Sequence, residues 1–296
     1  MNQEITPDRS GHLEVDRQQI WWEYHGKGDR EAVCPLNGLA MHTKAWYGFL
    51  PMLTDEYDVI LSDFLGQGES SKDDVPYFID VLARHLALIM DELGVEKVHP
   101  MGISYGGFIA LEFARLYPER LHTLILSGIL ASREKLFQMY QDISLRFYRG
   151  TKSEFELYTH YMYEKIFSER FVKNIPDEQL TAMRQRFYDR YIDYRYCLIR
   201  LTEAQDPFFA NIEERVEGYR KVTAPTLIMA GAHDRAIPLW QQEKLAEIFP
   251  NSRYELVPES GHVVYIERPD IFFPALKVFM AAKIVDFEMP SGEATA

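Results

Sequence analysis

Apolar residues along the chain recur in two alternating patterns, short β-rich runs and longer stretches with helical periodicity. Eight short runs are typical of strands, and they lie at residues 13–15, 20–24, 32–36, 59–61, 98–102, 121–126, 226–230 and 254–257. After the first two runs, helical patterns separate them, at residues 44–52, 79–93, 106–116, 239–249 and 270–282. This alternation predicts an α/β fold in which helices cover both faces of a mostly parallel, eight-stranded sheet.

One long segment interrupts the alternation. Residues 133–216 are helical in pattern throughout and too long for a loop, with an internal break at residues 174–177. We therefore expect a helical cap, or lid, at 133–216, inserted into a core formed by residues 1–132 and 217–296. The insertion is dense in Phe and Tyr, and most of these rings are expected to pack helices together. An aromatic inner face would also give an apolar pocket with a few hydroxyl groups.

A serine lies in a Gly-rich turn between a predicted strand and a predicted helix. The turn reads Gly102-Ile103-Ser104-Tyr105-Gly106. A connection this tight strains the serine backbone, and small neighbours tolerate it. It exposes the hydroxyl at the sheet edge, close to the N-terminal amides of the helix. Because this pattern arises by chance in roughly one chain in ten of this length, its context decides the interpretation.

A base and an acid follow later in the chain at matching positions. Asp234 comes just after the predicted strand 226–230, and His262 lies in the loop between the strand 254–257 and a helix. Serine is a poor nucleophile without a base. The set predicts Ser104 as nucleophile, His262 as general base and Asp234 as the group that orients the imidazole. The alternatives are a structural turn serine, a surface-loop histidine and a helix N-cap or turn aspartate.

Two further loops complete an ordered set of signals. Asn37-Gly38-Leu39-Ala40 follows the strand 32–36, and residues 63–70 form a Gly-containing loop after the strand 59–61. With the serine turn, the acid and the histidine, this order resembles the α/β-hydrolase fold family from about residue 13 to about residue 282. The resemblance implies an oxyanion hole made by the backbone N–H groups of Leu39 and Tyr105. Some members place the acid after the preceding strand, but residues 127–132 contain no carboxylate.

The residue before the loop glycine departs from the commonest family pattern. A histidine usually stands there, whereas this chain has Asn37. The Asn-Gly variant is similar to that of polyhydroxyalkanoate depolymerase-like proteins and hydroxyacyl ester synthases, unless Asn37 simply satisfies a local backbone bond. His42 and Trp46 follow closely, and each is expected either to line the pocket or to pack in the core.

Two prolines fall inside predicted strands, where they are unfavourable. Pro35 and Pro100 lie inside strands that the family places side by side at the centre, where proline removes a ladder donor. We expect a bulge or an early end of strand pairing at each of these positions.

The composition and the motifs limit which partners, compartment and cofactors we expect. The 296-residue chain carries a net charge of −13, which argues against nucleic acid or an anionic membrane surface. No run approaches about 18 apolar residues, so we expect no membrane span. Two cysteines, Cys34 and Cys197, give no disulfide framework and favour the cytoplasm. We find no metal-ligand spacing, phosphate loop or dinucleotide fingerprint and expect no metal and no cofactor.

Protein partners are less constrained by the sequence. A homo-oligomer is compatible with this composition. Five arginines alternate with acids within residues 184–200, on one predicted helix. A salt-bridged solvent face is the favoured interpretation, and docking of an acidic carrier protein is the less favoured one.

These expectations define a cytoplasmic serine hydrolase that cleaves a medium-sized, largely apolar carboxylic ester through an acyl-enzyme intermediate. One alternative is hydrolysis of a carbon–carbon bond in a dienoate ring-cleavage product. Another is acyl transfer to an alcohol or hydroxyacyl group. The least favoured is a ligand receptor without catalysis, because the serine, acid and histidine are all present.

Overall fold

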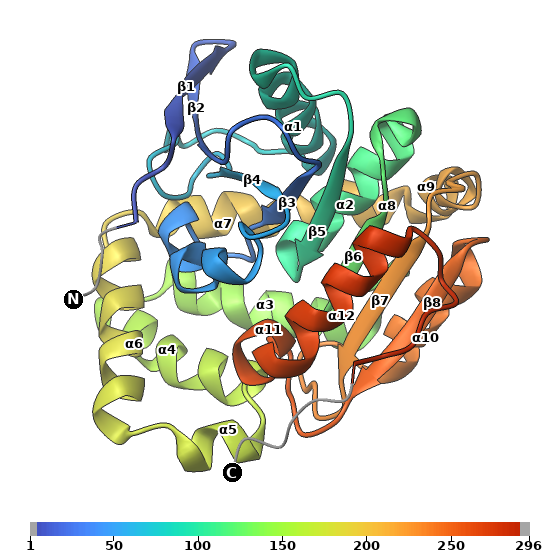
Figure 1. The fold of residues 1–296 in the computed structure, drawn as a ribbon. Helices are drawn as coiled ribbons and strands as arrows, with labels where there is room; N and C mark the ends of the chain where they lie inside the picture. Colours follow the sequence, from blue (N-terminus) through green and yellow to red (C-terminus); the bar gives the residue numbers. More distant parts are fainter. Residues whose placement is uncertain (1–4, 291–296) are drawn as a thin grey trace.

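The computed structural model describes residues 5–290 and has an eight-stranded sheet at its centre (Figure 1). The strand order is β1-β2-β4-β3-β5-β6-β7-β8, and all pairings after β4 are parallel. The strands are β1 (Arg9–Val15), β2 (Gln18–His25), β3 (Ala32–Leu36), β4 (Asp58–Ser62), β5 (Val98–Ile103), β6 (Leu124–Ser127), β7 (Thr226–Gly231) and β8 (Ser252–Val257). The predicted α/β fold class is confirmed.

The first two strands form the antiparallel part of the sheet. β1 pairs with β2 through a two-residue turn, and β2 pairs antiparallel with β4. Both turn residues, Asp16 and Arg17, have positive φ, at 50° and 68°. Such a turn matches the right-handed twist of the two strands it joins. The hairpin therefore extends one edge of the parallel sheet.

Helices cover both faces of the sheet, and strands β3 to β7 are consequently buried along their whole length. One face packs against α1 (Ile79–Leu93), α2 (Tyr105–Leu116) and α10 (Leu239–Ile248). The other face packs against the 3-10 helix η1 (Thr43–Met52), α11 (Val264–Glu267) and α12 (Pro269–Ala282). Several strands differ from their predicted bounds by a few residues, among them β1, which begins at Arg9, and β8, which begins at Ser252. Residues 44–52 form a 3-10 helix, and β6 begins at Leu124, because Leu121 makes only an isolated bridge after the short helix η2 (Pro118–Arg120).

The two central prolines lie where pairing stops on one side of their strands. β3 pairs with β4 only at Ala32 and Val33, so this ladder ends before Pro35. The ladder between β5 and β6 starts at Met101, immediately after Pro100. Each missing N–H therefore removes little from the sheet, while β3 and β5 stay paired with each other through both prolines. An early end of pairing is how the sheet accommodates them.

A helical insertion separates β6 from β7. It contains α3 (Lys135–Arg149), α4 (Lys152–Ile166), α5 (Glu169–Asn174), α6 (Asp177–Tyr191), α7 (Arg195–Glu203), α8 (Gln205–Ala210) and α9 (Ile212–Tyr219). The expected break at 174–177 separates α5 from α6, where Pro176 favours a helix start. In Figure 1, α3 to α6 lie beyond the ends at which the parallel strands finish. The insertion therefore faces the edge of the sheet that carries the serine turn.

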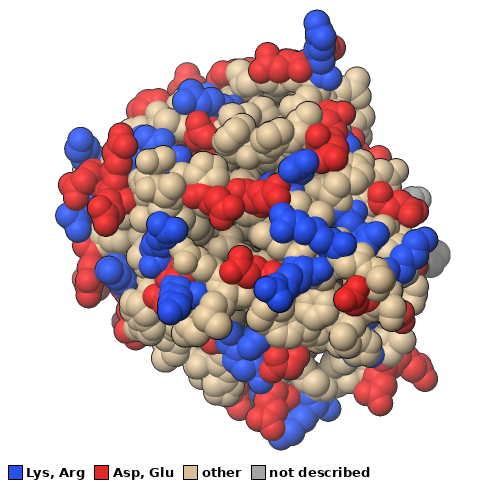
Figure 2. Space-filling model, turned by 180° about the vertical axis from the view of Figure 1, so that it is seen from behind, with Lys and Arg blue, Asp and Glu red and all other residues tan. Residues whose placement is uncertain are grey.

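The helices, the surface charge and the cysteines can be compared with what the sequence predicts. No helix within residues 5–290 is long and apolar enough to cross a membrane. Figure 2 shows acidic and basic side chains intermixed over the face opposite to that of Figure 1. On that face the mixture leaves no extended basic field of the kind that a nucleic-acid backbone requires. Both cysteines are buried and free.

Candidate active site

Ser104 occupies the turn between β5 and α2 with φ 52° and ψ −122°. A non-glycine residue in such a conformation stores strain of about 1–3 kcal/mol. The turn depends on close approach of the chain around it. A side chain at Gly106 would lie 2.3 Å from the carbonyl oxygen of Leu36, and one at Gly102 would lie 2.6 Å from Ala110 Cβ. Only glycine fits these two positions, which explains the small residues of the motif.

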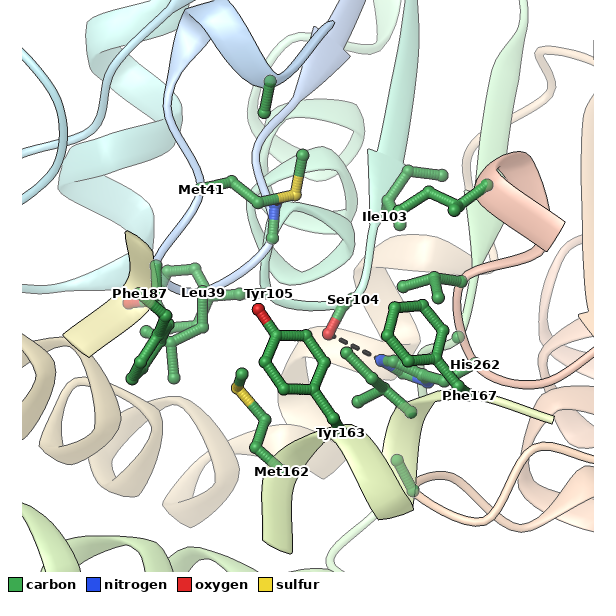
Figure 3. A pocket seen from close by; sticks show the side chains of 18 of the residues that line it. Leu39, Met41, Ile103, Ser104, Tyr105, Met162, Tyr163, Phe167, Phe187 and His262 are labelled. Atoms are coloured by element: carbon green, nitrogen blue, oxygen red, sulfur yellow. Dashed lines mark hydrogen bonds between the residues drawn. The ribbon is translucent and has the colours of Figure 1, made fainter. Parts of the chain in front are cut away.

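The predicted base and acid come together with the serine. His262 Nε2 lies 2.8 Å from Ser104 Oγ (Figure 3). His262 Nδ1 lies 2.9 Å from Asp234 Oδ2. Asp234 follows β7, and His262 follows β8. Gly128, just after β6, has φ 65°, and a side chain there would lie 2.7 Å from His262 Cε1. The ends of four parallel strands, β5 to β8, thus position the three groups and the space for the imidazole.

The charge environment favours a protonatable imidazole beside a fixed carboxylate. Burial by itself would lower the pKa of His262, but the charge and hydrogen bond of Asp234, with a smaller effect of the Glu267 charge, outweigh it and raise that pKa above its ordinary value. Asp234 Oδ1 accepts hydrogen bonds from the backbone N–H groups of Ala236 (2.8 Å) and Ile237 (2.9 Å). These donors fix the carboxylate and leave Oδ2 directed at the histidine.

Gln242, on α10, supports the acid, a role that the sequence does not predict. Its fully buried amide Nε2 donates to Asp234 Oδ2 at 3.0 Å, and its Oε1 accepts from Gly128 N at 3.1 Å. One side chain therefore connects the acid loop to the glycine beside His262. Neither spacing nor motif marks a glutamine in the middle of a helix, so the sequence offered no signal for it.

The two predicted amide donors belong to segments that run next to Ser104. Tyr105 is the first residue of α2, so its N–H has no acceptor within the helix. A side chain built at Gly38 would come within 3.7 Å of Ser104 Cβ, so the loop that carries Leu39 runs alongside the serine. This placement fits the expected oxyanion donors.

Asn37 fixes this loop and contacts none of the three reacting side chains. Its side-chain Nδ2 donates to Ser62 O (3.0 Å) and to Asp63 Oδ1 (3.3 Å), and its Oδ1 accepts from Trp46 Nε1 (2.8 Å). Burial raises the pKa of the Asp63 carboxyl to about 6. Trp46 is 1% exposed and packs with its ring centroid 4.8 Å from that of Tyr265. Of the two roles expected for Trp46, the structure thus places it in core packing, away from the pocket wall.

A cavity of about 860 Å³ opens over Ser104 and His262. His42 lines it, as one of its two expected roles requires. Burial, with the nearby charges of Arg190 and Lys44, lowers the pKa of His42 to about 4, so this imidazole is neutral at neutral pH. The insertion supplies mainly aromatic walls, and Figure 3 shows some of these side chains around the serine. They include Tyr140, Tyr158, Met162, Tyr163, Phe167 and Phe187.

The site contains no arrangement suited to a metal. Within residues 5–290, no group of three or more His, Cys, Asp or Glu side chains is placed to hold a metal ion. The chemistry available from the described side chains is therefore a hydroxyl, an imidazole, a carboxylate and backbone amides.

Comparison with known proteins shows the family of the chain. The family described as alpha/beta hydrolase fold matches residues 31–269, and the chain belongs to this family. A protein named "Putative carbamate hydrolase RutD", from Pseudomonas savastanoi pv. phaseolicola (strain 1448A / Race 6), is 27% identical over 252 residues, with 83% of this chain and 92% of that protein covered. A poly(3-hydroxyalkanoate) depolymerase from Ectopseudomonas oleovorans is 26% identical over 274 residues, with 90% and 91% covered.

A solved structure gives the same fold. The crystal structure of MGS-M2, an alpha/beta hydrolase enzyme from a Medee basin deep-sea metagenome library, matches with a TM-score of 0.80. It is 23% identical and the match covers 95% of this chain and 99% of that one. The expected resemblance to the α/β-hydrolase fold is thereby confirmed.

Proposed function

We propose that this protein is a serine hydrolase that cleaves a medium-sized, largely apolar carboxylic ester through an acyl-enzyme intermediate. The observation that carries the proposal is the hydrogen-bonded series from Ser104 Oγ through His262 to Asp234, at 2.8 and 2.9 Å. A serine hydroxyl gains nucleophilicity from an adjacent base, and the base from an oriented acid.

In the first half of the reaction, His262 Nε2 takes the proton of Ser104 Oγ as this oxygen attacks the ester carbonyl carbon. The Leu39 and Tyr105 amides donate to the resulting oxyanion. When the C–O bond to the alcohol breaks, the proton passes from Nε2 to the leaving oxygen. Asp234 holds the imidazole with Nδ1 protonated and stabilises the imidazolium.

In the second half, water attacks the acyl carbon and gives its proton to His262 Nε2. The bond to Ser104 Oγ breaks, the proton returns to this oxygen, and the carboxylic acid leaves. The helical insertion, residues 133–216, would act as the cap that encloses the acyl group. Its mainly apolar lining supports an apolar acyl part.

The names of the two relatives favour acyl chemistry at this site. A carbamate and a hydroxyalkanoate ester both present a carbonyl carbon to a nucleophile. We place the carboxylic ester first because the pocket is largely apolar and because the Asn37–Gly38 loop fits the depolymerase resemblance.

The test compares the full-length protein with its Ser104→Ala and Ser153→Ala variants. Ser153 is an exposed serine of α4 and serves as the matched control. We expect a fluorophosphonate probe to label the wild type and Ser153→Ala but not Ser104→Ala. We also expect p-nitrophenyl esters to give a burst only where labelling occurs.

Persistent labelling of Ser104→Ala would contradict the assignment of the nucleophile. Turnover of a dienoate, with none of a p-nitrophenyl ester series or a p-nitrophenyl carbamate, would replace the proposal by carbon–carbon hydrolysis. Addition of an alcohol that raises p-nitrophenol release and yields a new ester would indicate acyl transfer.

A further inference from the structure

The charged residues that line the active-site cavity are basic, although the chain as a whole is acidic. The sequence has 45 Asp and Glu residues and only 32 Lys and Arg. Among the described residues that line the cavity, however, there is no Asp or Glu, while Lys44, Arg186 and Arg190 are present. A pocket selected only for an apolar ligand would need none of these charges.

The three cations come from two regions that are far apart in the sequence. Lys44 lies on η1 of the core, and Arg186 and Arg190 lie four residues apart on α6, so they share one face of that helix. Lys44 and Arg186 are exposed and Arg190 is half-buried. The three residues, which we call the cationic mouth, therefore lie where the cavity opens to solvent.

The cationic mouth has no counterion among the described side chains. Within residues 5–290, no ion pair or side-chain hydrogen bond involves Lys44, Arg186 or Arg190. Of the other arginines of 184–200, Arg200 pairs with the carboxylate of Asp74 at 2.8 Å, whereas Arg184 donates to the neutral hydroxyl of Thr181 at 3.3 Å. The expectation of one salt-bridged helix thus needs correction, because the arginines divide between α6 and α7 and two of them face the cavity.

The charges of the cationic mouth reach the pocket wall. Arg190 and Lys44 help to lower the pKa of His42, after the larger effect of burial. Burial raises the pKa of Tyr163 to about 12, and Arg186, Arg190 and, least of the three, Arg184 oppose this rise. Both affected side chains line the cavity. Glu23 has the smallest effect on His42 and the opposite sign, and no Asp or Glu within residues 5–290 lines the cavity. An anionic group among these residues would therefore meet favourable charge.

We propose that Lys44, Arg186 and Arg190 bind an anionic oxyacid group, a carboxylate or a phosphate, carried by the substrate away from the scissile ester. This inference rests on the proposed function and narrows its substrate to esters with an apolar middle and an anionic end. Guanidinium groups suit such anions because they donate in a planar fork. A concave site selects a small-molecule anion over an acidic protein surface, since the apolar walls below it enclose the rest of the ligand.

The test uses p-nitrophenyl esters in matched pairs. One member of each pair is a hemiester of a dicarboxylic acid, from succinate to suberate, and the other carries a methyl ester in place of the free carboxylate. A phosphate-ended ester distinguishes the two anion chemistries. The readout is the ratio of kcat/KM for the anionic member to that for the neutral member.

For the wild type we expect a ratio well above one that peaks at one chain length and falls as NaCl is raised. Arg190→Gln should lower the ratio about tenfold, a loss typical of one charge-assisted hydrogen bond. Arg186→Gln and Lys44→Gln should lower it less, because both side chains are exposed. Arg184→Gln is the matched control: it removes a charge from the same helix at a residue that does not line the cavity, and it should lower the ratio less than any of the three substitutions in the cationic mouth.

A wild-type ratio of one or less, with neutral esters cleaved well, would overturn the inference and leave the proposed function standing. An equal effect of Arg184→Gln and Arg190→Gln would also overturn it. If no ester is cleaved at all, the proposed function fails, and calorimetric binding of glutarate or suberate to the wild type, lost in Arg190→Gln, would still support the anion site. Polyglutamate that inhibits far better than these diacids would instead indicate an acidic macromolecular partner and overturn the small-molecule assignment.

Discussion

The sheet core and the helical insertion build their parts of the site in different ways. The core positions Ser104, Asp234 and His262 through strand ends and close backbone approach, so that a single added carbon at Gly102 or Gly106 would collide with its neighbours. The insertion contributes side-chain surface, much of it aromatic, and leaves several large apolar groups exposed, among them Leu136, Met139 and Leu157. Geometry is thus rigidly set in the core, whereas the insertion can change its lining without moving the reacting groups. We expect substitutions in the core to alter rate, and substitutions in the insertion to alter which substrate is preferred.

The two regions meet at the histidine loop. The N–H of His262 donates to Ile166 O at 2.8 Å, at the end of α4. Glu267 accepts from Gly261 N at 3.0 Å and from Ser168 N at 3.1 Å, which ties the same loop to the start of α5. Deleting the insertion would therefore also loosen His262. Point substitutions test the comparison more cleanly than replacement of the insertion by a linker.

The largest effect is expected at the acid of the core. Asp234→Asn keeps the shape of the side chain but removes the charge that faces His262, and it should lower kcat on the order of 10⁴-fold, as in the template triad. Asp206→Asn, which neutralises an exposed aspartate of the insertion, should leave kcat within about threefold. Steady-state kinetics on one p-nitrophenyl ester provide the measurement. If both variants stay within tenfold of the wild type, Asp234 is not the orienting acid.

The pH profile should show the influence of Asp234 on the base. The neutral imidazole is the active form, so kcat/KM should rise with pH through an apparent pKa above the ordinary histidine value of about 6.5. The sign follows from the structure, because burial lowers the pKa of His262 but Asp234 and Glu267 together raise it by more. Below that pKa the rate should fall about tenfold per pH unit. In Asp234→Asn the residual activity should titrate at lower pH, and a flat wild-type profile between pH 5 and 8, with chemistry rate-limiting, would exclude His262 as the base.

A smaller loss of kcat is expected at Gln242. Here the effect of losing the hydrogen bond to Asp234 can be distinguished from a general loss of protein stability. Gln242→Leu removes the donor to Asp234 Oδ2 and should lower kcat about tenfold, the cost of one unsatisfied buried contact. Gln241→Leu is the matched control, since that buried amide bonds Ser132 and Glu134 and does not contact Asp234. Thermal unfolding should show both variants destabilised. Equal losses of kcat in the two variants would make Gln242 a structural residue only.

The sequence predicts those site residues that a local pattern marks, and it does not predict those that only long-range packing brings to the site. Ser104, Asp234 and His262 follow strand-like runs at short distances, so a one-dimensional pattern suffices to bring them to one edge of the sheet. Gln242 and Gly128 meet across 114 residues, and no local pattern records such a pair. The sequence also does not reveal that Arg186 and Arg190 line the cavity. The face of α6 that is turned toward the cavity depends on how this helix packs in the fold. Trp46 lies between these cases: its place near the oxyanion loop was foreseen, but its bond to Asn37 required the fold.

The smallest effect, a shift of preference, is expected in the insertion. Met162 lines the cavity from α4, and Met162→Ala would lengthen the space available to an acyl chain. Each additional buried methylene is worth about 0.8 kcal/mol, or roughly fourfold in kcat/KM, until the pocket is full. In the wild type, kcat/KM should therefore rise with acyl length from acetate and then drop, and Met162→Ala should move the maximum by one or two carbons while changing the best rate only a few-fold. Met139→Ala, at an exposed methionine of α3, should keep the wild-type profile. A flat profile in the wild type, or an unmoved maximum in Met162→Ala, would mean that the insertion does not select the acyl group and that its aromatic side chains serve packing alone.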